Sequence, residues 1–240
     1  MGYGKTGKSL AKYLTKQGAK IYFWDDNAKI LAKINKSYFK YEQEKSHIFD
    51  YIYVSPGISK NHKILKEARN QNIKVSTDIE LFLEKLKIIN MPMKLIAITG
   101  TNGKSTIALM IAKALGVKPL GNFGNSVLEN MIIKKQEVVL ELSSFQLDHL
   151  NYLKPNISII SNIKHDHLSY HGGFKNYIKA KIKISIFQDE NDYLILNYDD
   201  PTLRKYFYKK TNLNIKIIWV SIRKKIINGL SYIENSLFDN

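Results

Sequence analysis

The 240-residue sequence contains no cysteine, which excludes disulfide bonds and thiolate metal ligands and fits a reducing compartment. It has no apolar run that approaches the roughly 20 residues of a membrane-spanning helix, and its N-terminus lacks the apolar core of a signal peptide. With 44% hydrophobic and 24% charged residues, the composition is typical of a soluble globular protein. We therefore expect a cytoplasmic protein without a membrane partner.

Acidic residues are scarce relative to basic ones, because 21 Asp and Glu against 37 Lys and Arg give a net charge of +16. Such a charge can indicate nucleic-acid binding. Here the excess is spread as single lysines with no concentrated basic tract, which favours a solvated lysine-rich surface and no nucleic-acid partner. A basic nucleic-acid-binding protein is the alternative, and its affinity would fall steeply with salt.

Apolar runs of strand length alternate with helical patterns along almost the whole chain, which predicts βαβ units and mostly parallel sheets. The expected strands are residues 21–24, 51–54, 95–99, 138–142, 157–161, 193–196 and 215–220. The expected helices are residues 9–17, 63–70, 79–86, 105–115 and 174–187. Pro92 interrupts the pattern just before a new strand, so we expect a domain boundary between residues 90 and 91. The predicted fold is α/β, with a Rossmann-like domain over residues 1–90 and a phosphate-loop domain over residues 91–240.

The strongest motif spans residues 95–106, where a buried strand leads through a glycine turn into a helix. Backbone N–H groups in such a turn, with the helix N-terminus behind them, point at phosphate oxygens. We therefore predict that the phosphates of ATP are held by Gly100, Thr101, Asn102, Gly103, Lys104, Ser105 and Thr106. Lys104 would neutralise the β- and γ-phosphates, and the Ser105 hydroxyl would bind Mg²⁺. The standard loop has a glycine where this chain has Ile98, so the shorter turn indicates a subclass.

A second glycine turn, from Gly2 to Gly7, matches G-x-G-x-x-G. Asp25 ends the next strand 18 residues after Gly7, about where a ribose-binding acid belongs. By itself this turn is compatible with NAD, with a uridine nucleotide or with no ligand. Such a turn normally follows a strand, whereas here Met1 alone precedes it, so we expect the first strand to be missing.

Polar residues also follow other predicted strands at their carboxyl ends. Ser55, Pro56 and Gly57 form either a ligand-binding turn or an ordinary one. Glu141 ends a buried strand with a carboxylate that costs too much to bury unless it is paired or bound to metal. The run from Asn162 to His167 ends another strand of the same sheet, so both segments should lie near the phosphate loop. Carboxylate and imidazole together suit a divalent cation.

Together these residues resemble the Mur ligase family, and within it the branch that adds D-glutamate. The matching segments occur in family order along nearly the whole chain: Gly2–Gly7, Ser55–Gly57, Asp78–Phe82, Thr99–Thr106, Gly121–Gly124, Leu140–Leu147, Asn162–His167 and Tyr177–Lys183. The run Glu-Leu-Ser-Ser-Phe-Gln at residues 141–146 is specific to the D-glutamate-adding branch.

The resemblance implies an ATP-dependent carboxylate–amine ligase of peptidoglycan synthesis, and with it a role in cell-wall biogenesis, cell shape and cell division. ATP would phosphorylate the L-alanyl carboxylate of UDP-N-acetylmuramoyl-L-alanine, and the amine of D-glutamate would attack the acyl phosphate to form the amide. The implied catalytic residues are Lys104, Glu141, His167 and Lys181, and the implied Mg²⁺ ligands are Ser105, Glu141, His167 and Lys181. Lys181 matches a family lysine that becomes carbamylated, and the alternative is a surface lysine like its neighbours Lys179 and Lys183.

The resemblance also implies the substrate contacts. These are Lys5, Thr6 and Asp25 for the uridine nucleotide, Ser55, Pro56 and Gly57 near its diphosphate, and Asn122 and Ser143 near the muramoyl group. Lys5 replaces a residue that is commonly apolar in the family. His165 stands where the family usually has an acid, which leaves its role open.

The family's C-terminal domain, which binds D-glutamate and closes over ATP, has no counterpart in this sequence. We therefore expect a fragment that does not form the amide by itself, for which a separately encoded C-terminal domain would be a partner. Gly229–Ile233 predicts the start of a hairpin. The alternatives are another Mur ligase or a folylpolyglutamate synthase, and an NAD-binding Rossmann domain fused to an unrelated ATPase.

Overall fold

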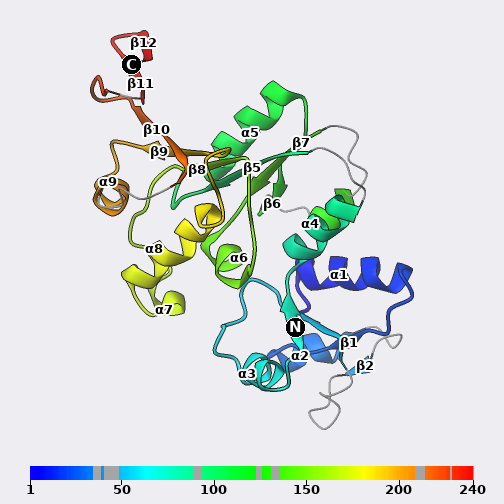
Figure 1. The fold of residues 1–240 in the computed structure, drawn as a ribbon. Helices are drawn as coiled ribbons and strands as arrows, with labels where there is room; N and C mark the ends of the chain where they lie inside the picture. Colours follow the sequence, from blue (N-terminus) through cyan, green and yellow to red (C-terminus); the bar gives the residue numbers. More distant parts are fainter. Residues whose placement is uncertain are drawn as a thin grey trace. The chain divides into compact units, whose positions relative to one another are not determined.

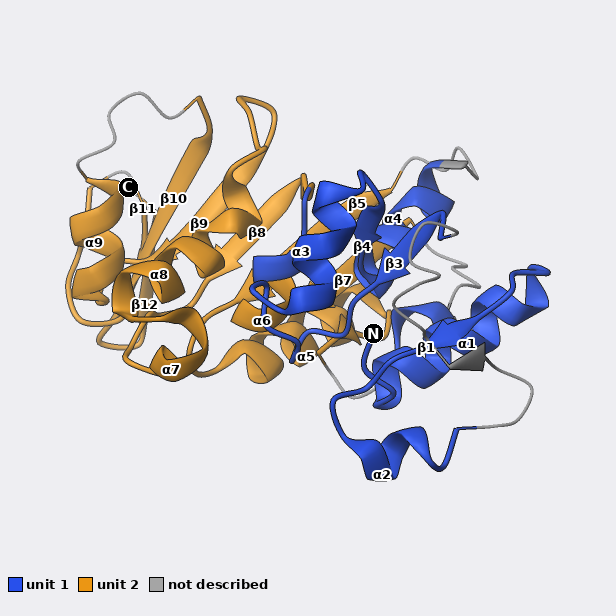
Figure 2. Ribbon diagram, turned by 90° about the horizontal axis from the view of Figure 1, so that it is seen from below, with its two compact units in different colours: residues 1–91, 124–133, 148–151 blue, residues 92–123, 134–147, 152–240 orange. Residues whose placement is uncertain are grey.

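The computed structural model (Figure 1) describes residues 1–34, 39–40, 49–88, 93–122, 126–130, 136–208, 214–227 and 229–239. The chain forms two compact units, coloured separately in Figure 2. The first unit is residues 1–91, 124–133 and 148–151, and the second is residues 92–123, 134–147 and 152–240. The predicted boundary between residues 90 and 91 lies outside the described residues and stays a prediction. Among the helices that are described, none is long and apolar enough to cross a membrane.

The first unit combines short strands with helices. Its elements are α1 Lys5–Lys16, β1 Tyr22–Phe23, α2 Ala28–Leu31, β2 Phe39–Lys40, β3 Tyr51–Tyr53, α3 Lys63–Asn70, β4 Lys74–Ser76, α4 Asp78–Ile88 and the 3₁₀ turn η2 Val127–Asn130. In the described ranges, β1 pairs with β2 and β3 pairs with β4, both parallel. Ile64, Leu65 and Ala68 of α3 pack on Ile52 and Val54 to form a core.

Local sequence explains where α4 begins. The Thr77 hydroxyl accepts from the Glu80 N–H at 3.2 Å, and a Glu80 carboxylate oxygen accepts from the Thr77 N–H at 3.2 Å. This reciprocal pair is a capping box, in which the two side chains accept hydrogen bonds from two backbone N–H groups that have no partner within the helix. The other Glu80 oxygen accepts from the Asn151 N–H at 2.7 Å. Burial of Asp78 raises the pKa of its carboxyl to about 6.

The second unit contains the larger sheet. Its elements are β5 Lys94–Thr99, α5 Lys104–Leu115, β6 Leu120–Gly121, β7 Glu137–Glu141, α6 Ser144–His149, β8 Ile157–Ile160, α7 Leu168–His171, α8 Phe174–Ile182, the 3₁₀ turn η3 Lys183–Ser185, β9 Tyr193–Asn197, α9 Pro201–Phe207, β10 Lys216–Ser221, β11 Gly229–Ile233 and β12 Ser236–Asp239. Within the described residues the sheet has eight strands, in the order β12-β11-β10-β9-β8-β5-β7-β6. All neighbours are parallel except β11 and β12, which form the predicted hairpin.

β5 is a buried strand of this sheet, flanked by β7 and β8. Ala108 and Ala112 of α5 pack on Ile96 and Ile98 of β5. On the opposite face, the Ser158 hydroxyl donates to the Ile184 carbonyl of η3 at 3.0 Å. Helices therefore cover both faces, as Figure 1 shows for α5 and α8. The carboxyl ends of β5, β7 and β8 consequently meet at one edge of the sheet, where ligands bind in open α/β sheets.

Two predicted helix bounds are wrong. The helix expected over residues 9–17 begins at Lys5, because Gly4, within the glycine turn, already serves as its N-cap. The helix expected over residues 174–187 ends at Ile182 and tightens into η3, where the carbonyl of Ile184 is taken by Ser158 of the sheet.

Candidate nucleotide and metal site

The predicted phosphate loop connects β5 to α5 through two glycines with positive φ. At Gly100, with φ of 154°, a Cβ atom would lie 1.9 Å from the Ser161 hydroxyl oxygen, so a larger residue does not fit. Gly103, with φ of 79°, is the N-cap of α5 in the left-handed conformation. Asn102, Gly103, Ser105 and Thr106 are exposed. The start of α5 is therefore open to a phosphate group, which its free N–H groups and dipole favour.

The end of β8 holds this loop in place. The Asn162 side chain accepts from the Asn102 N–H at 2.9 Å and donates to the Asn102 carbonyl at 2.9 Å. The Ser161 hydroxyl donates to the same carbonyl at 2.8 Å, and the Asn162 carbonyl accepts from the Thr101 N–H at 2.9 Å. Sequence reasoning placed Asn162 near the loop but missed this supporting role, and it did not single out Ser161. The only signal was the polar run that follows an apolar strand.

Two residues of α8 also reach the loop. The Tyr177 hydroxyl lies 3.0 Å from the Thr101 hydroxyl, and the Lys181 ammonium donates to the Gly100 carbonyl at 2.6 Å. Lys181 is 2% exposed, and its nitrogen lies 4.9 Å from the centre of the Tyr177 ring. Burial, and then the nearby positive charge of Lys104, lower the pKa of Lys181 to about 7. The predicted Lys181 is thus a buried amine beside the loop, in contrast to the exposed Lys179.

Lys104 is the first residue of α5, and its ammonium donates to the Thr101 carbonyl at 2.8 Å. This carbonyl accepts a hydrogen bond from the ammonium but does not neutralise its positive charge. A phosphate oxygen would accept the hydrogen bond and also neutralise the charge, so the position of Lys104 fits the predicted role.

Glu141 lies at the end of β7, opposite Ile98 of β5 in the sheet register. It is 1% exposed. One carboxylate oxygen accepts from the Asn122 side chain at 3.1 Å, and the other has no hydrogen-bond partner among the described residues. A buried carboxylate oxygen without a donor is costly, and a divalent cation would compensate it. Glu141 therefore fits its predicted metal role, whereas Asn122, predicted near the muramoyl group, here orients Glu141.

The segment after Glu141 forms α6. The Ser143 hydroxyl accepts from the Gln146 N–H at 3.2 Å, and the Gln146 side-chain oxygen accepts from the Ser143 N–H at 3.0 Å. This is a second capping box, so the distinctive residues of this motif also start a helix that the sequence did not predict. The Phe145 ring packs on the His167 ring with centroids 4.7 Å apart. It thereby joins the Glu141 segment to the His167 segment.

The predicted metal ligands come from four separate segments of the chain: α5, β7, the residue before α7, and α8. In the described ranges, no group of three or more His, Asp or Glu side chains is arranged to hold a metal ion. His167 has a left-handed backbone, with φ of 50°, and its ring lies 3.4 Å from the Asp166 carboxylate. His165 packs edge-on against the Phe174 ring at 4.0 Å. The metal role of Ser105, Glu141, His167 and Lys181 stays a prediction, and the role of His165 stays open.

In the first unit, the two predicted substrate turns and Asp25 meet at the ends of β1 and β3. Asp25 accepts from the Tyr3 N–H at 2.8 Å and from the Asn27 N–H at 2.9 Å, so its carboxylate fixes the glycine turn. The Ser55 hydroxyl donates to the Gly2 carbonyl at 3.1 Å. A Cβ atom on Gly7 would lie 1.9 Å from the Gly2 carbonyl oxygen, so only glycine fits at this position. The remaining predicted contacts are the exposed Lys5 and Gly57 and the half-buried Thr6 and Pro56.

Two family models match the chain. The Mur ligase middle domain matches residues 98–238, which is more than half of the chain, and the Mur ligase MurD-like N-terminal domain matches residues 1–77. The chain belongs to the Mur ligase family. The matched regions include the phosphate loop in the first model and the glycine turn in the second.

Named relatives of this Mur ligase chain include the UDP-N-acetylmuramoylalanine–D-glutamate ligase of Rickettsia bellii (strain RML369-C), which is 37% identical over 258 residues, with 100% of the chain and 54% of the relative covered. The ligase of the same name from Wolbachia pipientis wMel is 38% identical over 228 residues, covering 90% and 43%. That of Thermosipho africanus (strain TCF52B) is 36% identical over 220 residues, covering 85% and 52%. The chain spans about half the length of the curated relatives it matches.

Among solved structures, the UDP-N-acetylmuramate:L-alanyl-gamma-D-glutamyl-meso-diaminopimelate ligase from Neisseria meningitides aligns with a TM-score of 0.55 and 13% identity. The alignment covers 95% of this chain and 80% of that one. A murein peptide ligase from Psychrobacter arcticus 273-4 aligns with a TM-score of 0.53 and 13% identity, covering 91% and 52%. These similarities show the fold of this Mur ligase chain, and the predicted α/β class is confirmed.

Proposed function

We propose that this chain belongs to an ATP-dependent ligase that adds D-glutamate to UDP-N-acetylmuramoyl-L-alanine through an acyl phosphate. The observation that carries the proposal is the open phosphate loop with Lys104 at the helix start and the uncompensated Glu141 carboxylate beside it. The three relatives reported above carry the name of this activity. The substrate assignment rests on them and on the run from Glu141 to Gln146.

Residues of the second unit would bind ATP. The backbone N–H groups of the loop and of the first turn of α5 would donate to phosphate oxygens, and Lys104 would release the Thr101 carbonyl to bind the β- and γ-phosphates. Asn162 and Ser161 would hold the loop in its binding conformation, so that the loop does not have to become ordered again in each catalytic cycle.

Divalent ions fit the donors that this edge of the sheet offers. Ser105, Glu141, His167 and Lys181 would hold Mg²⁺, which when bound neutralises charge on the transferring phosphoryl group. Asn122 would keep one Glu141 oxygen oriented and leave the other for the ion.

Lys181 would contribute as a carbamate. Because its pKa is lowered to about 7, a large share of the side chain carries a lone pair at neutral pH. That nitrogen can attack CO₂, forming an N–C bond and releasing one proton, and the resulting anion would be an additional oxygen ligand. Tyr177 and the Gly100 carbonyl hold the nitrogen in place.

The first unit would bind the uridine-nucleotide end of the substrate. Gly4 and Lys5 of the glycine turn are exposed, and Asp25 and Ser55 fix the shape of the turn through hydrogen bonds. We assign this role to residues 1–90 and the ATP role to residues 91–240. D-glutamate would be the second substrate.

Calorimetric titration of ATP with Mg²⁺ tests the nucleotide site. Lys104→Ala should weaken binding by about 10- to 100-fold, because a charge-assisted contact contributes about 1.5–3 kcal/mol. Lys113→Ala, at the exposed far end of the same helix, is the matched control and should bind like the parent. Equal affinity of parent and Lys104→Ala would contradict the proposal.

Protection from proteolysis tests binding of the uridine-nucleotide substrate. UDP-N-acetylmuramoyl-L-alanine should slow cleavage of the first unit more than UDP-N-acetylmuramate, a folate or NAD. Protection by NAD alone would favour a dinucleotide-binding domain, and protection by a folate would favour the other ligase class.

A further inference from the structure

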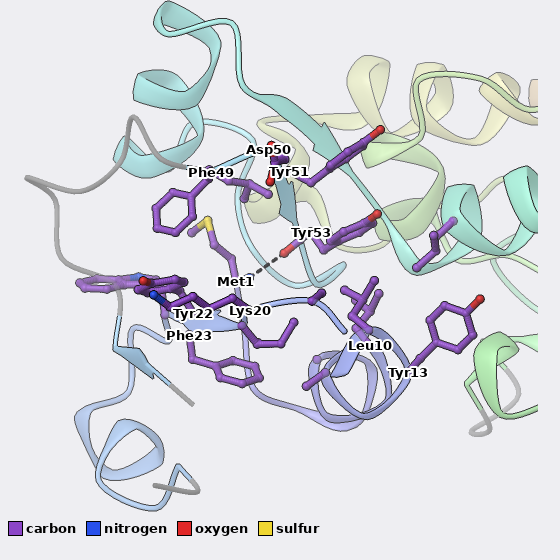
Figure 3. Close-up of a pocket in the computed structure, with 18 of the residues that line it drawn as sticks. Met1, Leu10, Tyr13, Lys20, Tyr22, Phe23, Phe49, Asp50, Tyr51 and Tyr53 are labelled. Carbon is purple, nitrogen blue, oxygen red and sulfur yellow. Dashed lines mark hydrogen bonds between the residues drawn. The ribbon is translucent and has the colours of Figure 1, made fainter. Parts of the chain in front are cut away.

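The proposed function leaves some buried features of the two units without a role. The first unit contains a cavity of about 670 Å³, lined by β1, β3 and α1 (Figure 3). Its lining is mostly apolar and aromatic, and nothing in the described residues shows what fills it. The second unit contains a buried polar pair, Ser144 of α6 and His171 of α7. This pair joins the segments that carry two of the proposed metal ligands, so it can affect the site.

Ser144 and His171 meet in the interior of the second unit. The Ser144 hydroxyl oxygen lies 3.1 Å from the Nε2 atom of His171, and the two residues are 2% and 8% exposed. A buried hydroxyl and a buried imidazole nitrogen each cost free energy without a hydrogen-bond partner. The bond therefore fixes the distance between the start of α6 and the end of α7.

Neither of these two helices is long enough to be stable without tertiary contacts. α6 has six residues and α7 has four, well below the length at which an isolated helix forms in water. α7 also lies between two residues with left-handed backbones, His167 with φ of 50° and Gly172 with φ of 67°. Contacts such as the Ser144–His171 bond must therefore hold both helices in place.

Aromatic rings extend this contact. The Phe145 ring centroid lies 4.7 Å from that of His167 and 5.7 Å from that of His171. The His171 ring also packs edge-on against the Tyr177 ring at 5.3 Å, and the Tyr177 hydroxyl lies 3.0 Å from the Thr101 hydroxyl of the phosphate loop. His171 thus contacts both α6 and the helix that reaches the loop.

We propose that His171 is a positioning residue for the divalent cation. Its hydrogen bond to Ser144 holds α6 against α7, and thereby sets the distance between Glu141 and His167. Ser144 stands three residues after Glu141, and His171 stands four residues after His167, so a shift of either helix would move one ligand away from the other. This inference rests on the proposed function, in which these two ligands bind Mg²⁺. The competing interpretation is a buried pair that contributes to stability alone.

Four variants separate the two interpretations. Ser144→Ala deletes the hydroxyl, and His171→Phe keeps an aromatic ring in the same place but no nitrogen. His171→Gln should restore the bond, because its amide nitrogen reaches about as far as Nε2. Ser231→Ala is the matched control, because this serine of β11 is also buried and its hydroxyl accepts from the Ile226 N–H at 3.0 Å.

The measurement is Mn²⁺ binding by the full chain, with free Mn²⁺ followed by EPR and with bicarbonate present for the Lys181 carbamate. Mn²⁺ favours the same oxygen ligands as Mg²⁺. Ser144→Ala and His171→Phe should each bind Mn²⁺ about tenfold more weakly than the parent, and the double variant no more weakly than either. His171→Gln should stay within about threefold of the parent. Ser231→Ala should lower Tm as much as these variants do and bind Mn²⁺ like the parent.

Glu141→Gln distinguishes failure of this inference from failure of the proposed function. Unchanged Mn²⁺ binding by Glu141→Gln, or a parent without saturable binding, would contradict the proposed metal site itself. Loss of the ion in Glu141→Gln together with parental affinity in Ser144→Ala and His171→Phe would overturn the positioning role alone. Equal losses in Ser231→Ala and His171→Phe would also overturn it, because Mn²⁺ affinity would then follow stability. So would a His171→Gln variant that binds as weakly as His171→Phe.

Discussion

Replacing Lys181 by methionine should stabilise the protein while removing its metal-dependent chemistry. The folded chain holds an amine that is 2% exposed, and its pKa is lowered from 10.5 to about 7, mainly by burial. This difference corresponds to about 5 kcal/mol of destabilisation when the group is charged. Methionine keeps a similar stem but leaves the Gly100 carbonyl without its donor, at a cost of about 1–2 kcal/mol. The expected net gain at pH 6 is about 3 kcal/mol.

The sign depends on pH. The unfolded chain binds more protons at Lys181 than the folded chain does between pH 7 and 10.5, so parent stability rises with pH in that window. The advantage of Lys181→Met should therefore be about 3 kcal/mol smaller at pH 9.5 than at pH 6. Lys179→Met, at an exposed lysine of the same helix, should show neither effect.

Urea unfolding followed by Trp219 fluorescence in a Trp24→Phe background reports on the second unit alone. The buffer should be free of CO₂ and metal, because a carbamate at Lys181 would change the charge being measured. A Lys181→Met variant less stable than the parent at pH 6, or a pH-independent difference, would refute the burial argument. In parallel, this variant should lose metal-dependent phosphoryl transfer in the complete ligase.

Three further predictions concern supporting residues. Asn162→Ala removes two hydrogen bonds to the phosphate loop and should lower ATP affinity, measured by calorimetry, about tenfold. An unchanged affinity would mean that the loop keeps its conformation without the Asn162 side chain. Gly7→Ala places a Cβ atom 1.9 Å from the Gly2 carbonyl and should cost about 3 kcal/mol in urea unfolding of the first unit, while Gly57→Ala, with nothing within 4 Å, should cost little. The free energy of unfolding of Asp78→Asn should rise relative to the parent by up to about 3 kcal/mol between pH 4 and pH 7. The folded-state pKa of Asp78 is raised to about 6, so the parent loses stability as pH rises through that value. A difference that stays constant between pH 4 and pH 7 would contradict this.

Local sequence was sufficient to predict the elements that carry the site. The strand at 95–99 and the helix at 105–115 match β5 and α5 to within a residue, because a buried apolar run and a glycine turn specify them without distant partners. The helix at 63–70 matches α3. The short helix α6 escaped prediction, because six residues are too few for a periodic pattern and its capping box lies inside a motif read for its chemistry.

The sequence by itself determined which residue types stand at the carboxyl ends of the strands, and so the family and the class of ligand. Only the tertiary structure decided what those residues contact: Asp25 fixes a glycine turn, Asn122 orients Glu141, and Asn162 holds the phosphate loop by hydrogen bonds. It also decided that Lys181, and not Lys179, is buried. The physical reason is that helix and strand patterns arise from neighbours along the chain, whereas burial, pKa and hydrogen-bond partners arise from segments tens of residues apart that the parallel sheet brings to one edge.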